Sequence, residues 1–137
     1  NSIFPLKRAI SGSTYHHPGP MLPSPDEFEI TPAELNELRS TVVTPTFRLI
    51  DCREQDEFAI CRIDGAELFP LSRFSDEATG TLLNPEDERP IIVYCHHGMR
   101  SMNATRFLRG KGKEMVWSLA GGIDLWSLLI DPGVPRY

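Results

Sequence analysis

The sequence lacks the features that would place the chain in a membrane, on nucleic acid or around a structural metal. No apolar stretch approaches the roughly 18 residues that a transmembrane helix needs, and no signal-peptide pattern opens the chain. A net charge of −5 leaves no basic face for nucleic acid or an anionic membrane. The three cysteines include no Cys-x-x-Cys pair, which argues against structural zinc. We therefore expect no nucleic-acid or membrane partner, no metal and no cofactor.

Length and composition predict one compact domain behind an irregular lead-in segment. The chain has 137 residues, of which 40% are hydrophobic, and it contains no internal repeat, so a single domain can bury a sizeable core. The first residues differ, because prolines are interleaved there with Ser11-Gly12-Ser13, a composition typical of extended or irregular chain. We predict a proline-, serine- and glycine-rich extension over residues 1–25 and a folded domain over residues 26–137.

Cys95 stands between a predicted strand and a predicted helix. The preceding segment, Ile91-Ile92-Val93-Tyr94, is β-branched and aromatic and follows the breaker Pro90, which predicts a buried strand of a parallel sheet. From Ser101 to Gly110, apolar residues recur at helical spacing. A helix N-terminus that follows a loop presents unpaired N–H groups and the positive end of the helix dipole. A thiol in that loop is therefore placed to be a nucleophile.

Such a thiol is expected to ionise near neutral pH. Free cysteine titrates near pH 8.5, and a helix N-terminus with nearby cations brings the pKa to roughly 3.5–7.5. Arg100 adds a permanent positive charge, and Gly98 lets the backbone curl. The alternative, that Cys95 packs as a small hydrophobe, is disfavoured by its strand–loop–helix setting. A reactive thiol among an odd number of cysteines favours a reducing compartment, so we expect a cytoplasmic location.

The other cysteines and the two histidines of the loop are given lesser roles. Cys52 lies in a second apolar strand and is predicted to pack in the core. Cys61 lies in a short polar connection and is predicted to be partly exposed, with little support for a second redox role. His96 and His97 could assist proton transfer or add positive potential for an anionic substrate. A thiolate that is already formed needs no base, so we favour the effect on the local potential.

Asp51 and Arg53 end a predicted strand, where the ligands of open α/β sheets gather. A carboxylate and a guanidinium so close in sequence form a structural ion pair more often than a catalytic one. We therefore predict that these two residues support the site, with Glu57 as a candidate partner.

The rest of the chain alternates strands with helices. Thr31 and Glu34 form a capping box with Pro32 at the first helical position, which predicts a helix to about Arg39. This alternation predicts an α/β fold with a mainly parallel central sheet. The remaining elements are predicted as strands at Phe47–Asp51, Gly65–Phe69 and Met115–Trp117, a helical turn within Leu71–Ala78, a polar loop at Thr79–Arg89 and a final helix from about Ile123 to Leu128.

The segment Cys95-His96-His97-Gly98-Met99-Arg100-Ser101 resembles the active-site loop of the rhodanese-like sulfurtransferases. Three further segments resemble signatures of that family in the right order, so the resemblance covers roughly residues 27–130. It implies a single rhodanese-like domain whose sheet is flanked by helices on both faces. Arg62 departs from the family pattern, which usually has histidine there. The matching segments are Ile30–Leu35, Leu49–Glu54 with the following Glu57-Phe58 and Ile63–Ala66, and Leu119–Trp126.

The resemblance also implies a reaction. The Cys95 thiolate attacks the sulfane sulfur of a small anionic donor such as thiosulfate, keeps it as a persulfide and passes it to a thiophilic acceptor. The loop residues His96, His97, Gly98, Met99, Arg100 and Ser101 are then expected to bind the donor and stabilise the persulfide. Four residues separate Cys95 from Arg100, whereas the related phosphatases have five. This tighter loop favours sulfur over phosphate.

Two alternatives stay open. Residues 130–137 resemble the ending of rhodanese domains joined to adenylating enzymes, which implies a persulfide relay to a sulfur-carrier protein or from a cysteine desulfurase. The domain could instead be a regulatory module without catalysis. The joint presence of Cys95, Gly98 and Arg100 counts against that second alternative.

Overall fold

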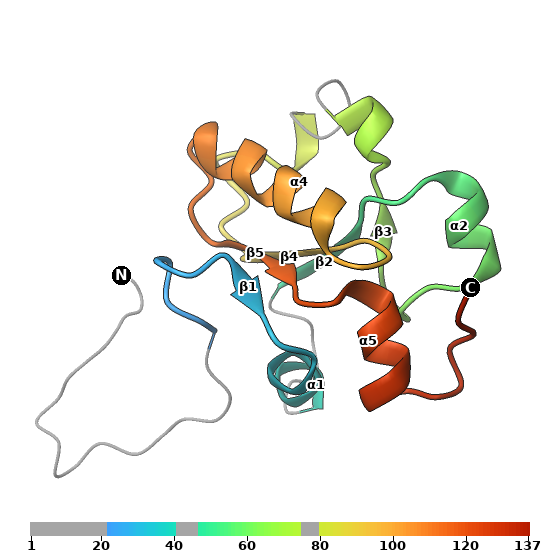
Figure 1. Ribbon diagram of the computed structural model, residues 1–137. Coiled ribbons are helices and arrows are strands. Elements are labelled where there is room, and N and C mark those ends of the chain that lie inside the picture. Colours follow the sequence, from blue (N-terminus) through green and yellow to red (C-terminus); the bar gives the residue numbers. More distant parts are fainter. Residues whose placement is uncertain (1–21, 41–46, 75–79) are drawn as a thin grey trace, which may run out of the picture.

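A parallel sheet forms the centre of the molecule (Figure 1). The computed structural model describes residues 22–40, 47–74 and 80–137. Within these residues the sheet has five strands in the order β1-β5-β4-β2-β3, and every pair is parallel. The predicted parallel α/β fold is therefore confirmed. The strands are β1 (Glu29–Ile30), β2 (Arg48–Asp51), β3 (Glu67–Leu68), β4 (Ile91–Tyr94) and β5 (Val116–Leu119).

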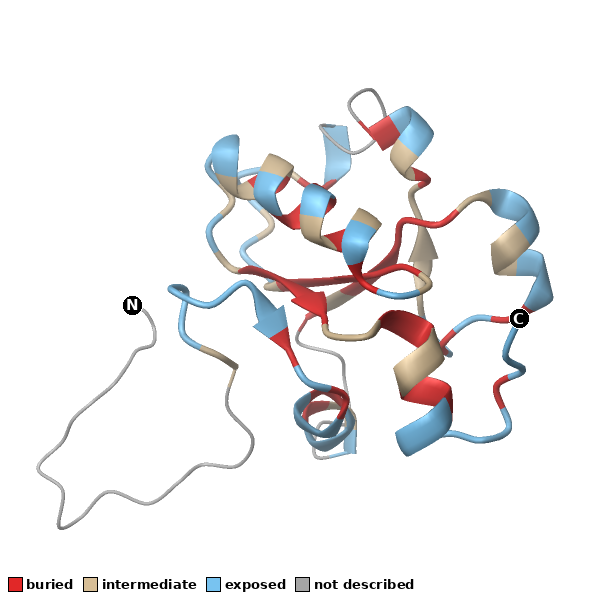
Figure 2. Ribbon diagram, viewed as in Figure 1, coloured by how far each residue is buried: buried red, intermediate tan, exposed pale blue. Residues whose placement is uncertain are grey.

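Helices cover both faces of the sheet, as expected from the family resemblance. On one face α4 (Met99–Gly110) packs Ala104 and Leu108 against the odd-numbered residues of β4. On the other face lie α1 (Pro32–Ser40) and α5 (Gly122–Leu129), as Figure 1 shows. Because both faces are covered, β4 and β5 are buried along their whole length (Figure 2), and the sequence of β4 is a continuous apolar run rather than an alternating one.

The helix boundaries show where local sequence signals are sufficient. At the start of α1 the Thr31 N–H donates to Glu34 Oε1 at 2.8 Å and the Glu34 N–H to Thr31 Oγ1 at 3.1 Å, so the predicted capping box is confirmed. By contrast, α2 (Gln55–Ile60) was not predicted. It has only six residues and no serine, threonine, aspartate or asparagine at its N-cap, and these are the usual signals.

The connection between β3 and β4 differs from its prediction. The helical turn expected within residues 71–78 begins as a 3₁₀ turn, η2 (Leu71–Arg73), and residues 75–79 lie outside the described ones. Gly80 and Thr81 are helical although the polar loop was expected to include them. The neighbouring Leu82 is buried in the core and anchors this segment, so residues 80 and 81 are not part of a solvent-exposed loop.

The predicted N-terminal extension is described only from Leu22 onward. Leu22 packs against the hydrophobic core, and the Ser24 carbonyl accepts a hydrogen bond from Trp117 Nε1 at 3.1 Å. In the described residues, no helix combines the length and the apolar character needed to cross a membrane.

Candidate active site

Cys95 follows β4 directly and lies beneath the first turn of α4. Its Sγ accepts hydrogen bonds from the backbone N–H of Gly98 at 3.1 Å and of Ser101 at 3.3 Å. The Ser101 hydroxyl oxygen lies 3.4 Å from the same sulfur and 2.7 Å from the hydroxyl of Ser118 on β5. The residue is only 1% exposed. The strand–loop–helix arrangement expected from the sequence thus surrounds the thiol with hydrogen-bond donors.

These donors favour the ionised thiol. The pKa of Cys95 is lowered to about 5, first by a hydrogen bond from the Cys52 thiol and then by the donors of Ser101 and Gly98, against the opposing effect of burial. The same contact, together with burial, raises the pKa of Cys52 far above its ordinary range. Cys95 is therefore a thiolate at neutral pH while Cys52 stays protonated. Cys52 is buried as predicted, but it was assigned to packing alone, and its contact with Cys95 was missed.

Two glycines make the tight loop around Cys95 feasible. Gly98 adopts a φ of +113°, which side chains rarely tolerate, and this turn aims its N–H at the sulfur. Gly122, with φ of +62°, opens α5 where a Cβ atom would collide with the carbonyl oxygens of Cys95 and His96. Those carbonyls accept from the N–H groups of Ile123 at 2.9 Å and Asp124 at 3.1 Å. Gly122 therefore lets α5 approach the Cys95 loop closely.

Arg100 forms a forked ion pair with Glu57 of α2. The Nη1–Oε2 distance is 2.7 Å and the Nη2–Oε1 distance is 2.9 Å, so both terminal nitrogens are engaged. The hydrogen bonds from Arg100 are the first cause that lowers the pKa of Glu57 to about 2. This geometry favours a role for Arg100 in holding the loop in place over the expected binding of the donor. The suggestion that Glu57 partners the pair Asp51 and Arg53 directly was wrong.

Asp51 and Arg53 form the ion pair expected from their spacing. Both are fully buried, with Arg53 Nη2 at 2.7 Å from Asp51 Oδ2 and Arg53 Nε at 3.0 Å from Oδ1. Arg53 also donates to the carbonyl of Cys61. Cys61 is only 8% exposed, so the expectation of partial exposure was wrong. The Arg53 guanidinium explains why Cys61 is buried although its segment is polar. It donates to the Cys61 carbonyl and lies 4.0 Å from the Cys61 sulfur, so it covers the thiol.

Tyr137 is a site residue that sequence reasoning missed. Its hydroxyl donates to Glu57 Oε1 at 2.8 Å and accepts from Arg53 Nη1 at 2.8 Å, so it joins the two ion pairs into one network. Its ring stacks on His96 with centroids 4.0 Å apart and planes 9° apart. Beside it, Arg136 pairs with Asp124 of α5 at 2.9 Å. The only sequence signal was the resemblance of residues 130–137 to a family ending, which carries no contact information.

The two loop histidines stack on each other and do not contact the sulfur through any described hydrogen bond. His96 lies between Tyr137 and His97, whose ring centroid is 3.9 Å away at an interplanar angle of 26°. Burial and then the charge on His97 lower the pKa of His96, so this imidazole is neutral at pH 7. A neutral imidazole carries no positive charge, so the expected contribution of His96 to a positive potential is not favoured. His97 is exposed, with Nε2 at 3.8 Å from Asp124 Oδ2.

His96, His97 and Asp124 bring possible metal-ligand atoms within 4.8 Å of one another. A bound metal lies close to the plane of each imidazole that ligates it, at about 2.1 Å from the nitrogen. Two rings 3.9 Å apart and inclined by only 26° have planes that do not meet at such a short distance. The arrangement therefore suits stacking better than coordination.

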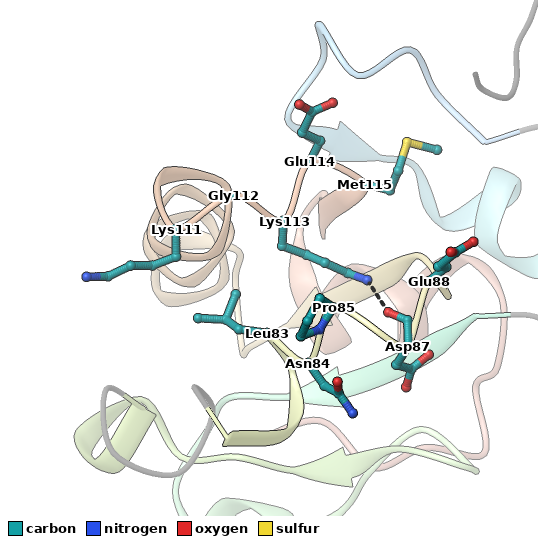
Figure 3. Close-up of a pocket in the computed structure, with 10 residues that line it drawn as sticks. All are labelled: Leu83, Asn84, Pro85, Asp87, Glu88, Lys111, Gly112, Lys113, Glu114 and Met115. Atoms are coloured by element: carbon teal, nitrogen blue, oxygen red, sulfur yellow. Dashed lines mark hydrogen bonds between the residues drawn. The ribbon is translucent and has the colours of Figure 1, made fainter.

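A hollow elsewhere on the molecule does not include the thiol (Figure 3). Its lining comes from the segments that precede β4 and β5, and Lys113 Nζ donates across it to the Asp87 carbonyl at 2.9 Å. These segments lie at the amino ends of parallel strands, whereas Cys95 follows a carboxyl end. The hollow is lined by Leu83, Asn84, Pro85, Asp87, Glu88, Lys111, Gly112, Lys113, Glu114 and Met115.

Curated relatives include proteins named as sulfurtransferases. The chain is 34% identical over 97 residues to thiosulfate sulfurtransferase GlpE of Ectopseudomonas mendocina, covering 71% of this chain and 82% of that protein. It is 34% identical over 108 residues to the chloroplastic rhodanese-like/PpiC domain-containing protein 12 of Arabidopsis thaliana, with 76% of this chain aligned. The chain spans only 36% of that plant relative's length. It is also 30% identical to adenylyltransferase and sulfurtransferase MOCS3 of Drosophila ananassae, over 76% of this chain and 24% of that protein.

Solved structures and a family profile agree with these relatives. The human single-domain sulfurtransferase TSTD1 superposes with a TM-score of 0.62 at 25% identity, covering 74% of this chain and 96% of that one. A rhodanese-like domain from Anabaena gives a TM-score of 0.67 at 25% identity, covering 81% and 80%. The profile of the rhodanese-like domain matches residues 31–129, a span that contains α1, the strands β2 to β5 and the Cys95 loop. The chain therefore belongs to the rhodanese-like domain family.

Proposed function

We propose that this domain is a sulfurtransferase that forms a persulfide on Cys95 from thiosulfate or another sulfane-sulfur donor. The thiolate attacks the outer sulfur of thiosulfate, the S–S bond of the donor breaks, and sulfite leaves. The sulfur then passes from Cys95 to a thiophilic acceptor, which restores the thiolate. This sequence is covalent catalysis in two half-reactions, so ping-pong kinetics are expected.

The observation that carries the proposal is the set of donors on the Cys95 sulfur. Backbone N–H groups at the start of α4 and the Ser101 hydroxyl surround it, and they act together with the positive end of the helix dipole. A charge that moves from Sγ to an attached outer sulfur stays within this field. The same groups thus support both the attacking thiolate and the persulfide.

The position of Arg100 favours sulfur over phosphate as the transferred group. A phosphate held over a cysteine needs a guanidinium whose forked donors face its oxygens. Here both terminal nitrogens of Arg100 are engaged by Glu57. Together with the four-residue spacing, this pairing disfavours phosphatase activity.

A second candidate acceptor is a partner protein, such as a sulfur carrier, with a cysteine desulfurase as the donor. Met99 is 81% exposed beside the loop, and a flexible thioether suits contact with a protein better than contact with a small anion. The similarity to proteins named adenylyltransferase and sulfurtransferase supports the same candidate. It predicts poor turnover with cyanide and rapid transfer to the protein partner.

Intact-mass analysis after thiosulfate treatment tests the proposal. The wild-type protein should gain the mass of one sulfur atom, cyanide should remove it, and Cys95→Ser should gain nothing. Absence of an adduct from both thiosulfate and a cysteine-desulfurase donor would exclude sulfur transfer and leave a regulatory module. Hydrolysis of an aryl phosphate that depends on Cys95, without sulfur uptake, would instead establish a phosphatase.

A further inference from the structure

Cys52 and Cys95 are neighbours across the two central strands. Asp51 of β2 is the register partner of Tyr94 of β4, and the Cys52 N–H donates to the Tyr94 carbonyl at 3.0 Å. The next residue on each strand is therefore a cysteine opposite a cysteine. Both are buried in the same hydrophobic cluster beneath α4, so the two side chains share one face of the sheet.

This placement meets the geometric requirement for a disulfide. Neighbouring strands lie about 4.8 Å apart, and the Cα atoms of bridged cysteines are usually about 4.4–6.8 Å apart. The two thiols lie in one buried cluster, and each shifts the pKa of the other. A bond between the sulfurs therefore needs a change of side-chain torsion rather than a movement of the strands.

We propose that Cys52 is a resolving thiol that discharges the Cys95 persulfide as hydrosulfide when no acceptor is present. This inference rests on the proposed function, since the persulfide supplies the oxidising equivalent. The Cys52 sulfur attacks Sγ of Cys95, the bond from Sγ to the outer sulfur breaks, and a Cys52–Cys95 disulfide forms. The proton of Cys52 moves to the departing sulfur, which leaves as HS⁻. Cys52 is oxidised from thiol to disulfide, the outer sulfur is reduced, and the net charge is unchanged.

The surroundings explain why Cys52 would act only after loading. While Cys95 is a thiolate, its proximity and burial raise the pKa of Cys52, so Cys52 stays a thiol. In the persulfide the negative charge lies on the outer sulfur, so Sγ becomes an electrophile. Cys61 cannot attack Sγ of Cys95 in the same way, because it packs in the cluster on the other face of the sheet. An external dithiol would reopen the disulfide by thiol–disulfide exchange and return the enzyme to its starting state.

The test follows the mass of the full chain after loading. The protein is treated with thiosulfate under nitrogen, freed of donor by desalting, and sampled over time for intact mass and released hydrosulfide. The wild type should lose the added sulfur, fall to the mass of the reduced protein minus two hydrogen atoms, and release one equivalent of hydrosulfide. Peptide mapping should then find Cys52 joined to Cys95. Cys52→Ser should keep its persulfide about tenfold longer or more.

Cys61→Ser is the matched control, because it removes the third thiol and should discharge as the wild type does. A wild-type persulfide that lasts as long as that of Cys52→Ser overturns the inference and leaves the proposed function intact. No sulfur uptake and no disulfide in any variant would refute both. The decisive measurement is made on the wild-type protein, so it remains valid if Cys52→Ser folds poorly.

Discussion

The Cys95 loop and the ionic network beside it are built in opposite ways. The loop holds its sulfur mainly with backbone N–H groups from one continuous segment, residues 95–101. The network joins side chains that lie far apart in sequence, from the end of β2, from α2, from α4 and from the tail. A site of the first kind depends on backbone shape, whereas one of the second kind depends on every partner being present. Four predictions test this difference, from the largest expected effect to the smallest.

The loop prediction concerns the ionisation of Cys95. Alkylation by iodoacetamide should stay near its maximum from pH 8 down to pH 6 and fall only as the pH drops through about 5, because the thiolate persists above its lowered pKa. A cysteine with an ordinary pKa near 8.5 would already lose its thiolate below pH 8. Labelling rates measured by mass spectrometry, with Cys95→Ser as the blank, give the midpoint. A midpoint above pH 8 would contradict the role assigned to Cys52, Ser101 and Gly98 in lowering the pKa of Cys95.

Within the network, the buried pair should matter most for stability. Asp51→Ala leaves the Arg53 guanidinium charged and without its partner in the interior, and this should lower the free energy of unfolding by about 3–5 kcal/mol. Urea denaturation followed by circular dichroism measures the loss. The surface pair Arg89 and Asp87 has similar geometry, with the Arg89 side chain 49% exposed, so Arg89→Ala is the matched control and should lose far less. Equal losses would show that burial does not set the effect.

The pair between Glu57 and Arg100 should be weaker and should respond to pH. Glu57 has a lowered pKa in the folded protein, so its contribution is complete above the ordinary value of 4.5 and is lost as the pH falls toward about 2. Glu57→Gln should cost about 1 kcal/mol at pH 7, since the pair is partly exposed, and less at pH 3, where part of the contribution has been lost. The urea concentrations at the unfolding midpoint of the wild type and of Glu57→Gln, compared at the two pH values, measure this difference. A larger loss in acid than at pH 7 would contradict the assignment.

The hydroxyl of Tyr137 should have an effect no larger than that of the pair between Glu57 and Arg100. Tyr137→Phe keeps the ring on His96 and removes the two hydrogen bonds that join Arg53 to Glu57, which should cost about 1 kcal/mol of unfolding free energy. Tyr137→Leu is the comparison, because it removes the aromatic stack as well and should cost more. If both variants unfold at the wild-type urea concentration, the hydroxyl does not connect the two pairs energetically.

The parts of the fold that sequence could predict are those with a local physical signal. Strand β4 is wholly apolar, and β2 and β5 each carry apolar side chains on both faces, because helices cover both faces of the sheet. Helix α1 carries a complete capping box. Helix α2 was missed because its cap uses glutamates and its six residues are too few for a helical period. The position of Cys95 followed from the strand before it and the helix after it, since all three are contiguous.

The contacts that sequence could not predict all cross long gaps in the chain. Cys52 lies beside Cys95 only because β2 and β4 become neighbours through crossover connections. The sequence of neither strand indicates which strands will be adjacent in the sheet. Glu57 meets Arg100 across 43 positions, and Tyr137 meets Glu57 across 80. Charge and residue type could suggest several partners for each of these side chains. Only the folded arrangement selects among them.

The close approach of α5 to the Cys95 loop has a consequence for the energy of each turnover. Two N–H groups of α5 hold the carbonyl oxygens of Cys95 and His96, while the start of α4 holds the sulfur from the other side. The dipoles around the sulfur are thus oriented before any substrate arrives, and they need no reorganisation when charge moves outward by one bond. Arrival and departure of a sulfur atom should therefore leave the backbone where it is. The domain would thus carry sulfur on Cys95 through each cycle without a conformational change of the groups that surround it.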